Sequence, residues 1–148
     1  MKYTALTILS FVAFVSNGQK VDSKFVPDAI HSNFVKKFPH AKSVAWSMEG
    51  EDEYEAEFTN AGVEQSSNFN KNGKWLVTET AIKVSQLPSA IQSSIDSEYN
   101  EFKIKEAEKV EDAANQIFYE VELEKRELKI EVKFAADGKT ISKEEYKD

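Results

Sequence analysis

The sequence predicts an α+β protein in which two α-β4 repeats form one antiparallel sheet of about eight strands, with two helices packed on one face. The first observation is an internal sequence repeat. Residues 69–79 align with residues 134–144 at a constant offset of 65. The second is a Val-Pro or Leu-Pro pair that opens a helical stripe in each half. The third is an alternation of apolar and polar residues, which is typical of half-buried strands. It lies in each half between the helical stripe and the repeated segment that follows.

Residues 1–18 have the pattern of a signal peptide. Lys2 precedes an apolar run, and Ser16 and Gly18 place small residues before a cleavage site at Gln19. The run is shorter than the roughly 20 residues of a membrane helix. We therefore predict an exported protein, periplasmic or extracellular, whose mature chain (19–148) is a single domain without a membrane span. A retained N-terminal anchor is the alternative.

The first repeat is predicted over about residues 25–82, and it opens with a helix. Pro27 suits the first turn of a helix, where its missing N–H is not needed. Ile30, Phe34 and Phe38 follow at a spacing of four and form one apolar stripe, which Pro39 ends.

Four strands follow the first helix. The alternation changes to period two, and we predict strands over 42–48, 53–58, 63–69 and 74–80. The turn at Asn72-Gly73 joins the last two, because both residues tolerate the positive φ of a tight hairpin turn.

The second repeat is predicted over about residues 86–146 and has the same order. Its helix opens at Pro88, and Ile91, Ile95 and Tyr99 form its stripe. Strands follow from residue 102 onward, with clear alternation over 119–123 and 128–134, and Asp137-Gly138 turns the chain into the last strand. Neither repeat of about 60 residues buries much surface alone, so the two should share one sheet.

The mature chain is acidic and lacks cysteine. Without residues 1–18 it has 18 basic and 26 acidic residues, a net charge of −8. Nucleic acids and anionic membranes need a basic patch, so the net charge argues against both as partners. The absence of cysteine excludes disulfides, cysteine-ligated zinc and thiol catalysis.

The sequence holds no pattern typical of an enzyme, and we predict that the protein is not one. His31 and His40 are the only histidines, and their spacing does not place them on one helical face. Residues 49–53 are acidic but lack the spaced ligands of a calcium loop, and Asn70–Gly73 and Asp137-Gly138 are better explained as hairpin turns. We predict no cofactor and no metal site.

The repeated motifs resemble the PepSY-like proteins, also described as beta-lactamase-inhibitor-like and common in the Bacteroidetes. In this chain they are a helix opened by Val-Pro or Leu-Pro, a Tyr-x-x-x-Phe/Leu strand, and Phe-x-x-x-Gly-Lys followed by Glu. The resemblance covers about residues 25–145, and the second repeat has Thr140 where the first has Trp75. It implies a curved antiparallel sheet with the helices on its back and no established activity. The classical inhibitors contain cysteine, which this chain lacks.

The open sheet face is the predicted binding site. If Tyr54 and Phe58 point to the helices, the opposite face carries Glu53, Glu55, Glu57, Trp75 and Val77. Exposed aromatic residues anchor partners and charges steer them. We predict a non-enzymatic exported module that binds a protein or peptide of the cell envelope, in the manner of an inhibitor. The alternative is a periplasmic protein that binds a small cationic ligand or a metal ion. Nothing in the sequence specifies an oligomeric state.

Overall fold

One antiparallel sheet dominates the structure, a computed structural model that describes residues 18–147. Its nine strands run in sequence order from β1 to β9, and each pairs with the next. The predicted α+β class is confirmed. The predicted signal peptide lies almost entirely outside the described residues. The extra strand is β1 (Gln19–Val21), which pairs with β2 and was not predicted.

The elements repeat in order, with a short 3-10 turn, a helix and four strands in each half. In chain order after β1 they are η1 (Ser23–Phe25), α1 (Asp28–Lys37), β2 (Ala41–Glu49), β3 (Glu53–Asn60), β4 (Val63–Asn70), β5 (Trp75–Ala81), η2 (Val84–Gln86), α2 (Ser89–Glu98), β6 (Lys103–Asp112), β7 (Ile117–Lys125), β8 (Leu128–Ala135) and β9 (Thr140–Lys147).

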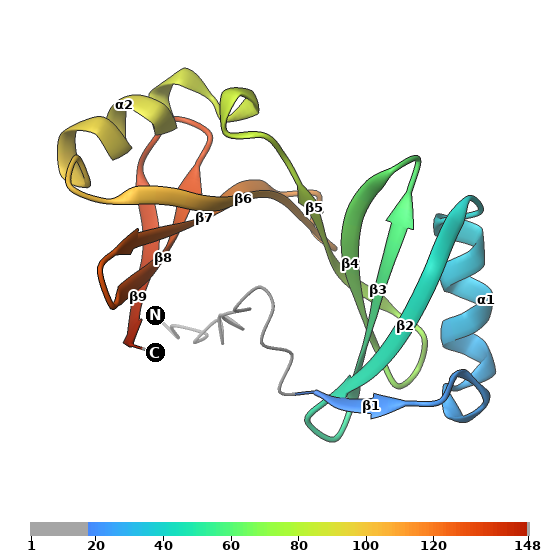
Figure 1. The fold of residues 1–148 in the computed structure, drawn as a ribbon. Coiled ribbons are helices and arrows are strands. Elements are labelled where there is room, and N and C mark those ends of the chain that lie inside the picture. The colour runs from blue at the N-terminus through green and yellow to red at the C-terminus, as the bar shows by residue number, and fades with distance from the viewer. Residues whose placement is uncertain (1–17, 148) are drawn as a thin grey trace, which may run out of the picture.

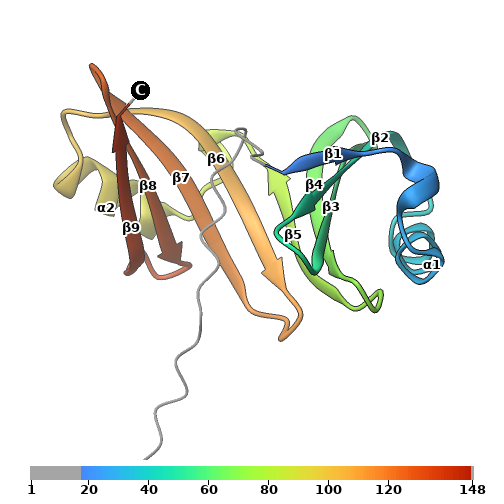
Figure 2. The same cartoon turned by 90° about the horizontal axis from the view of Figure 1, so that it is seen from below.

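The two halves of the sheet bend away from each other at β5 and β6. Figures 1 and 2 show α1 on the outer side of one half and α2 on the outer side of the other. The face opposite the helices is therefore concave. No helix in residues 18–147 has the length and apolar character needed to cross a membrane.

Each helix covers its own core, as its apolar stripe predicts. Ile30 and Phe34 of α1 are buried, and Phe34 packs edge-to-face on Trp46 and Phe58 at ring-centroid distances of 5.2 and 5.0 Å. The second core holds the following buried residues: Leu87, Ile91, Ile95, Ala107, Val121, Leu123, Ile130, Val132 and Phe134. The helix stripes thus placed the core correctly.

Both hairpin turns contact the helix of their own half in the same way. Asn33 of α1 donates its side-chain N–H to the carbonyl oxygen of Gly73 at 2.8 Å. Ser94 of α2 donates its hydroxyl to the carbonyl oxygen of Gly138, also at 2.8 Å. The aligned glycines of the two repeats therefore hold the end of each hairpin against a helix.

Removing one of these hydrogen bonds should weaken the fold measurably. We expect Ser94→Ala to lower the free energy of unfolding by about 1 kcal/mol, because the Gly138 carbonyl loses its partner in a half-buried site. Urea denaturation measures this, with the exposed Ser93→Ala as the matched control on the same helix. Equal stability of the two variants would show that the contact contributes nothing.

Candidate binding face

The concave face of the sheet is lined with glutamates from five strands. Cross-strand pairs place their side chains on one side: Glu57 lies opposite Ser66, which lies opposite Glu79, and Glu108 lies opposite Glu120. We call this surface the acidic face and define it by Glu53, Glu55, Glu57, Glu79, Glu106, Glu108, Glu120, Glu122 and Glu131.

Several of these carboxylates are buried although they lie on an open face. The exposed fractions of Glu55, Glu79, Glu120 and Glu108 are 2%, 5%, 5% and 9%. Glutamate is almost never fully buried unless it is paired. Three of them, Glu55, Glu79 and Glu108, line one cavity at the bend of the sheet.

Burial shifts the pKa values of this cluster strongly. Loss of hydration, followed by the charges of Glu120 and Glu108, raises the pKa of Glu79 to about 9. The same cause raises the pKa of Glu55 and of Glu108 to about 7, and that of Glu131 to about 8. Part of the cluster is therefore protonated near neutral pH.

Most of the buried carboxylates have a hydrogen-bond donor. Ser47 donates to Glu55 and Ser66 donates to Glu79, each at 3.2 Å between the oxygens. On β3, Glu53 accepts a hydrogen bond of 2.7 Å from Asn68.

The centre of the second half holds an ion pair. Lys133 lies 2.7 Å from Oε1 of Glu120, and both side chains are largely buried. Burial raises the pKa of Glu120, and the lysine opposes that shift. The other oxygen of Glu120, Oε2, is buried and has no hydrogen-bond partner among the described residues.

Glu108 differs from its neighbours. Its carboxylate takes part in no hydrogen bond or ion pair with any residue from 18 to 147, although the side chain is nine-tenths buried. It borders a cavity of about 220 Å³ at the bend of the sheet. The lining residues are Ser43, Ala45, Glu55, Glu57, Phe58, Thr59, Glu64, Gln65, Ser66, Glu79 and Glu108.

The predicted orientation of Trp75 was wrong. Trp75 packs against the first core, on the helix side of the sheet, where Lys37 lies 3.5 Å from its ring centroid. The cause is an irregular register: Asn68 pairs with Val77 but the next residue, Phe69, pairs with Trp75. One residue of β5 has no partner in β4 at this point. The side chains before it therefore point to the opposite face of the sheet from the one that simple alternation predicts.

The other predicted residues lie together on the acidic face. Glu53, Glu55 and Glu57 follow one another along β3, and Val77 lies opposite Asn68 beside them. Sequence reasoning missed Glu79, Glu108, Glu120 and Glu131. Glu131 alternates with the buried Ile130 and Val132, so the alternation that located the first three could have found it.

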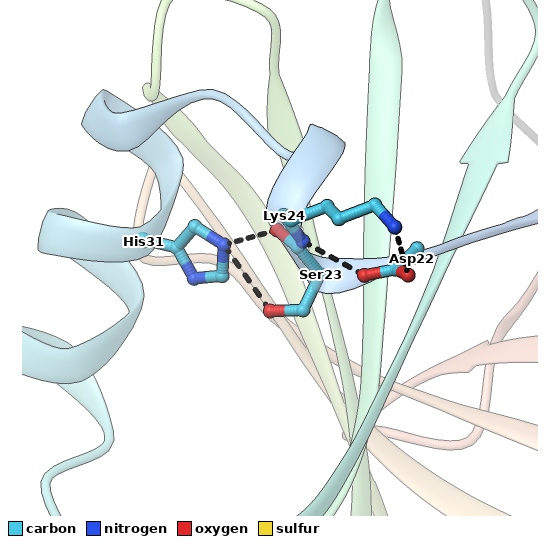
Figure 3. A network of polar contacts seen from close by, with 4 residues as sticks. All are labelled: Asp22, Ser23, Lys24 and His31. Carbon is cyan, nitrogen blue, oxygen red and sulfur yellow. Dashed lines mark hydrogen bonds and ion pairs between the residues drawn. The ribbon is translucent and has the colours of Figure 1, made fainter.

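A polar network joins η1 to α1 and brings a serine and a histidine together (Figure 3). Nε2 of His31 lies 2.8 Å from the carbonyl oxygen of Ser23 and 3.4 Å from the Ser23 hydroxyl. A carbonyl oxygen can only accept, so Nε2 carries the proton and cannot accept the hydroxyl proton. The pair is therefore not arranged as a nucleophile with its base. The imidazole instead packs edge-on against Trp46 at 5.4 Å.

The described residues, 18–147, contain no group of three His, Asp or Glu side chains arranged to hold a metal ion. The acidic face spreads its carboxylates over five strands.

Comparison with known proteins identifies the family. The family model described as "Putative beta-lactamase-inhibitor-like, PepSY-like" matches the chain over residues 13–64 and 52–142. The chain belongs to the PepSY-like family. This confirms the resemblance noted in the repeated helix and turn motifs. A comparison with curated proteins found no match.

Solved structures share the fold of this PepSY-like chain. A DUF2874 family protein from Bacteroides uniformis is 23% identical, with a TM-score of 0.75 over 80% of this chain and 88% of that one. A BLIP-like protein from Bacteroides fragilis is 24% identical, with a TM-score of 0.72 over 82% and 87%. A third, from Bacteroides eggerthii, is described as "putative periplasmic proteins" and is 20% identical, with a TM-score of 0.74 over 82% and 89%.

Proposed function

We propose that this PepSY-like protein is a non-enzymatic exported module that binds a basic segment of a protein or peptide in the cell envelope on its acidic face. The observation that carries the proposal is the concave arrangement of buried and half-buried carboxylates from five strands. The beta-lactamase-inhibitor-like family description, the BLIP-like neighbour and the neighbour described as periplasmic support a binding role outside the cytoplasm.

Electrostatics favours a basic partner over an acidic or neutral one. A concave surface lined mainly by one sign of charge concentrates its field and speeds the encounter with an oppositely charged partner. A partner that brings positive charge also relieves the repulsion among the carboxylates, which an acidic partner would increase.

Charge reversal tests the proposal. We expect the double variant Glu57→Lys/Glu106→Lys to weaken binding of the partner at least about tenfold, since both side chains lie on the acidic face and are accessible. The partner is captured from envelope extract with residues 19–148, identified by mass spectrometry and purified. The dissociation constant is then measured for each variant.

The matched control changes the net charge equally at another place. Asp96→Lys/Glu98→Lys alters two exposed residues of α2, on the other side of the sheet, and should leave the affinity within about twofold. Equal losses of affinity in both double variants would show that net charge alone causes the effect. Unchanged binding by the acidic-face variant, or capture of an acidic segment, would contradict the proposal.

A further inference from the structure

We infer that the cavity bordered by Glu55, Glu79 and Glu108 receives the guanidinium group of one arginine side chain of the bound partner. The inference rests on the proposed function and names the chemical group that this part of the acidic face recognises. The cavity lies at the bend of the sheet and is lined by side chains of β2 to β6.

An unsatisfied carboxylate is the first argument. Glu108 is nine-tenths buried, and its carboxylate has no hydrogen-bond donor or ion-pair partner among residues 18–147. Burial removes most of the hydration of this carboxylate, and no donor of the described residues replaces it, which costs free energy. A donor supplied by a ligand in the adjoining cavity would satisfy this carboxylate.

The charges around the cavity are the second argument. Every charged side chain that lines it is acidic: Glu55, Glu57, Glu64, Glu79 and Glu108. The largely buried lysine of the acidic face, Lys133, is held by Glu120 and lies 4.2 Å from the ring centroid of Phe118. Lys133 is therefore engaged elsewhere, and no lysine or arginine is among the lining residues.

The size of the cavity is the third argument. About 220 Å³ is smaller than the 300 to 1,000 Å³ of pockets for drug-sized ligands. It suits one side chain or a group of similar size. The cavity opens on the concave face, so a side chain could enter it while the rest of its protein lies on the sheet.

Arginine fits this site better than lysine. A guanidinium has five N–H donors in a planar fork, so it can bond carboxylates from several strands at once. It is also less strongly hydrated than an ammonium group and loses less on entering a largely buried site. The carboxylates of Glu55, Glu79 and Glu108 come from three different strands, as such a multiple contact requires.

Protonation gives the binding a distinctive pH dependence. Burial raises the pKa of Glu108 and of Glu55 to about 7, and that of Glu79 to about 9, so the empty cavity holds protons at neutral pH. A cation favours the ionised carboxylates, and its binding should release protons and strengthen as the pH rises from 6 to 8. The charged groups around the cluster are Glu49, Glu53, Glu57, Glu64, Glu106, Glu120, Glu131, Lys133 and Glu144.

A small probe isolates the cavity from the rest of the interface. N-acetyl-arginine amide is titrated into the protein, with the neutral isostere N-acetyl-citrulline amide, N-acetyl-lysine amide, putrescine and Ca²⁺ in parallel. We expect saturable NMR shifts of the backbone amides of β5 and β6 for the arginine probe alone, with proton release in calorimetry. Glu108→Gln, which keeps the shape but not the charge, should weaken this binding about tenfold, and Glu98→Gln on α2 should not.

The outcomes separate this inference from the proposed function. Equal binding of citrulline, lysine, putrescine or Ca²⁺, or no shift in β5 and β6, would overturn the arginine assignment. The envelope partner provides the second measurement. If Glu57→Lys/Glu106→Lys abolishes its binding and Glu108→Gln does not, the acidic face binds the partner but the cavity takes no arginine. If neither variant weakens binding of the envelope partner, the proposed function is contradicted as well. Thermal unfolding of Glu108→Gln verifies that the variant is folded.

Discussion

Replacement of Gly138 by alanine is expected to lower the free energy of unfolding by about 3 kcal/mol. Gly138 has a φ of +86°, which L-residues rarely adopt. A Cβ there would also lie 2.6 Å from the carbonyl oxygen of Ala90 in α2, a clash with backbone that cannot move independently. Strain of the backbone and displacement of the helix add together. Gly73 has the same two properties against Ala29 of α1, so Gly73→Ala should behave alike.

A third glycine separates the two causes. Gly62 has a φ of +83°, but a Cβ there meets no atom within 4 Å. Gly62→Ala therefore adds only the backbone strain, about 1 kcal/mol. Urea denaturation of the three variants gives the difference directly. Equal losses at Gly62 and Gly138 would show that the close approach of hairpin to helix does not matter.

The stability of the protein is expected to fall between pH 5 and pH 9. In the folded chain the pKa of Glu79 is raised to about 9, well above the ordinary 4.5 of the unfolded chain. The folded state therefore keeps a proton that the unfolded state has released, and its contribution to stability is lost as the pH rises through about 9. The raised pKa values of Glu55, Glu108 and Glu131 act in the same direction.

A neutral substitution should remove much of this dependence. Glu79→Gln cannot ionise and can still accept the hydrogen bond of Ser66, so at pH 8 we expect it to stabilise the protein by roughly 3 kcal/mol. At pH 5, where Glu79 is protonated, the variant and the wild type should differ little. Chemical denaturation at both pH values measures the effect.

The exposed Glu98→Gln on α2 serves as the control and should change stability by a few tenths of a kcal/mol at either pH. If the wild type is more stable at pH 9 than at pH 5, or Glu79→Gln destabilises at pH 8, then burial does not raise the pKa of Glu79.

Much of the architecture could be predicted from local patterns. Ile30 and Phe34 lie on the buried side of α1, Pro39 follows its end, and Gly73 and Gly138 mark the two hairpins that the alignment of the repeats located. These features depend on periodicity and on backbone geometry, which neighbouring residues largely determine. The strand β1 was missed because three residues that pair only with β2 carry no periodic pattern of their own.

The binding face was predicted in part. The alternation along β3 placed Glu53, Glu55 and Glu57 opposite the helices, as found. The same rule failed for Trp75, since the extra residue in β5 reverses the alternation at the start of that strand. Such an irregularity depends on how two strands pair, and one strand alone does not reveal it.

Local patterns in the chain specified the repeats, the two helices, the hairpin turns and the acidic side of β3, because each of these depends on residues close together in the sequence. Tertiary structure alone decided that the sheet bends at β5 and β6, that Glu55, Glu79 and Glu108 become buried together, and that Glu108 is left without a partner. Burial and pKa depend on distant strands meeting in space. Burial at this place raises the pKa of Glu79 to about 9 and that of Glu108 to about 7.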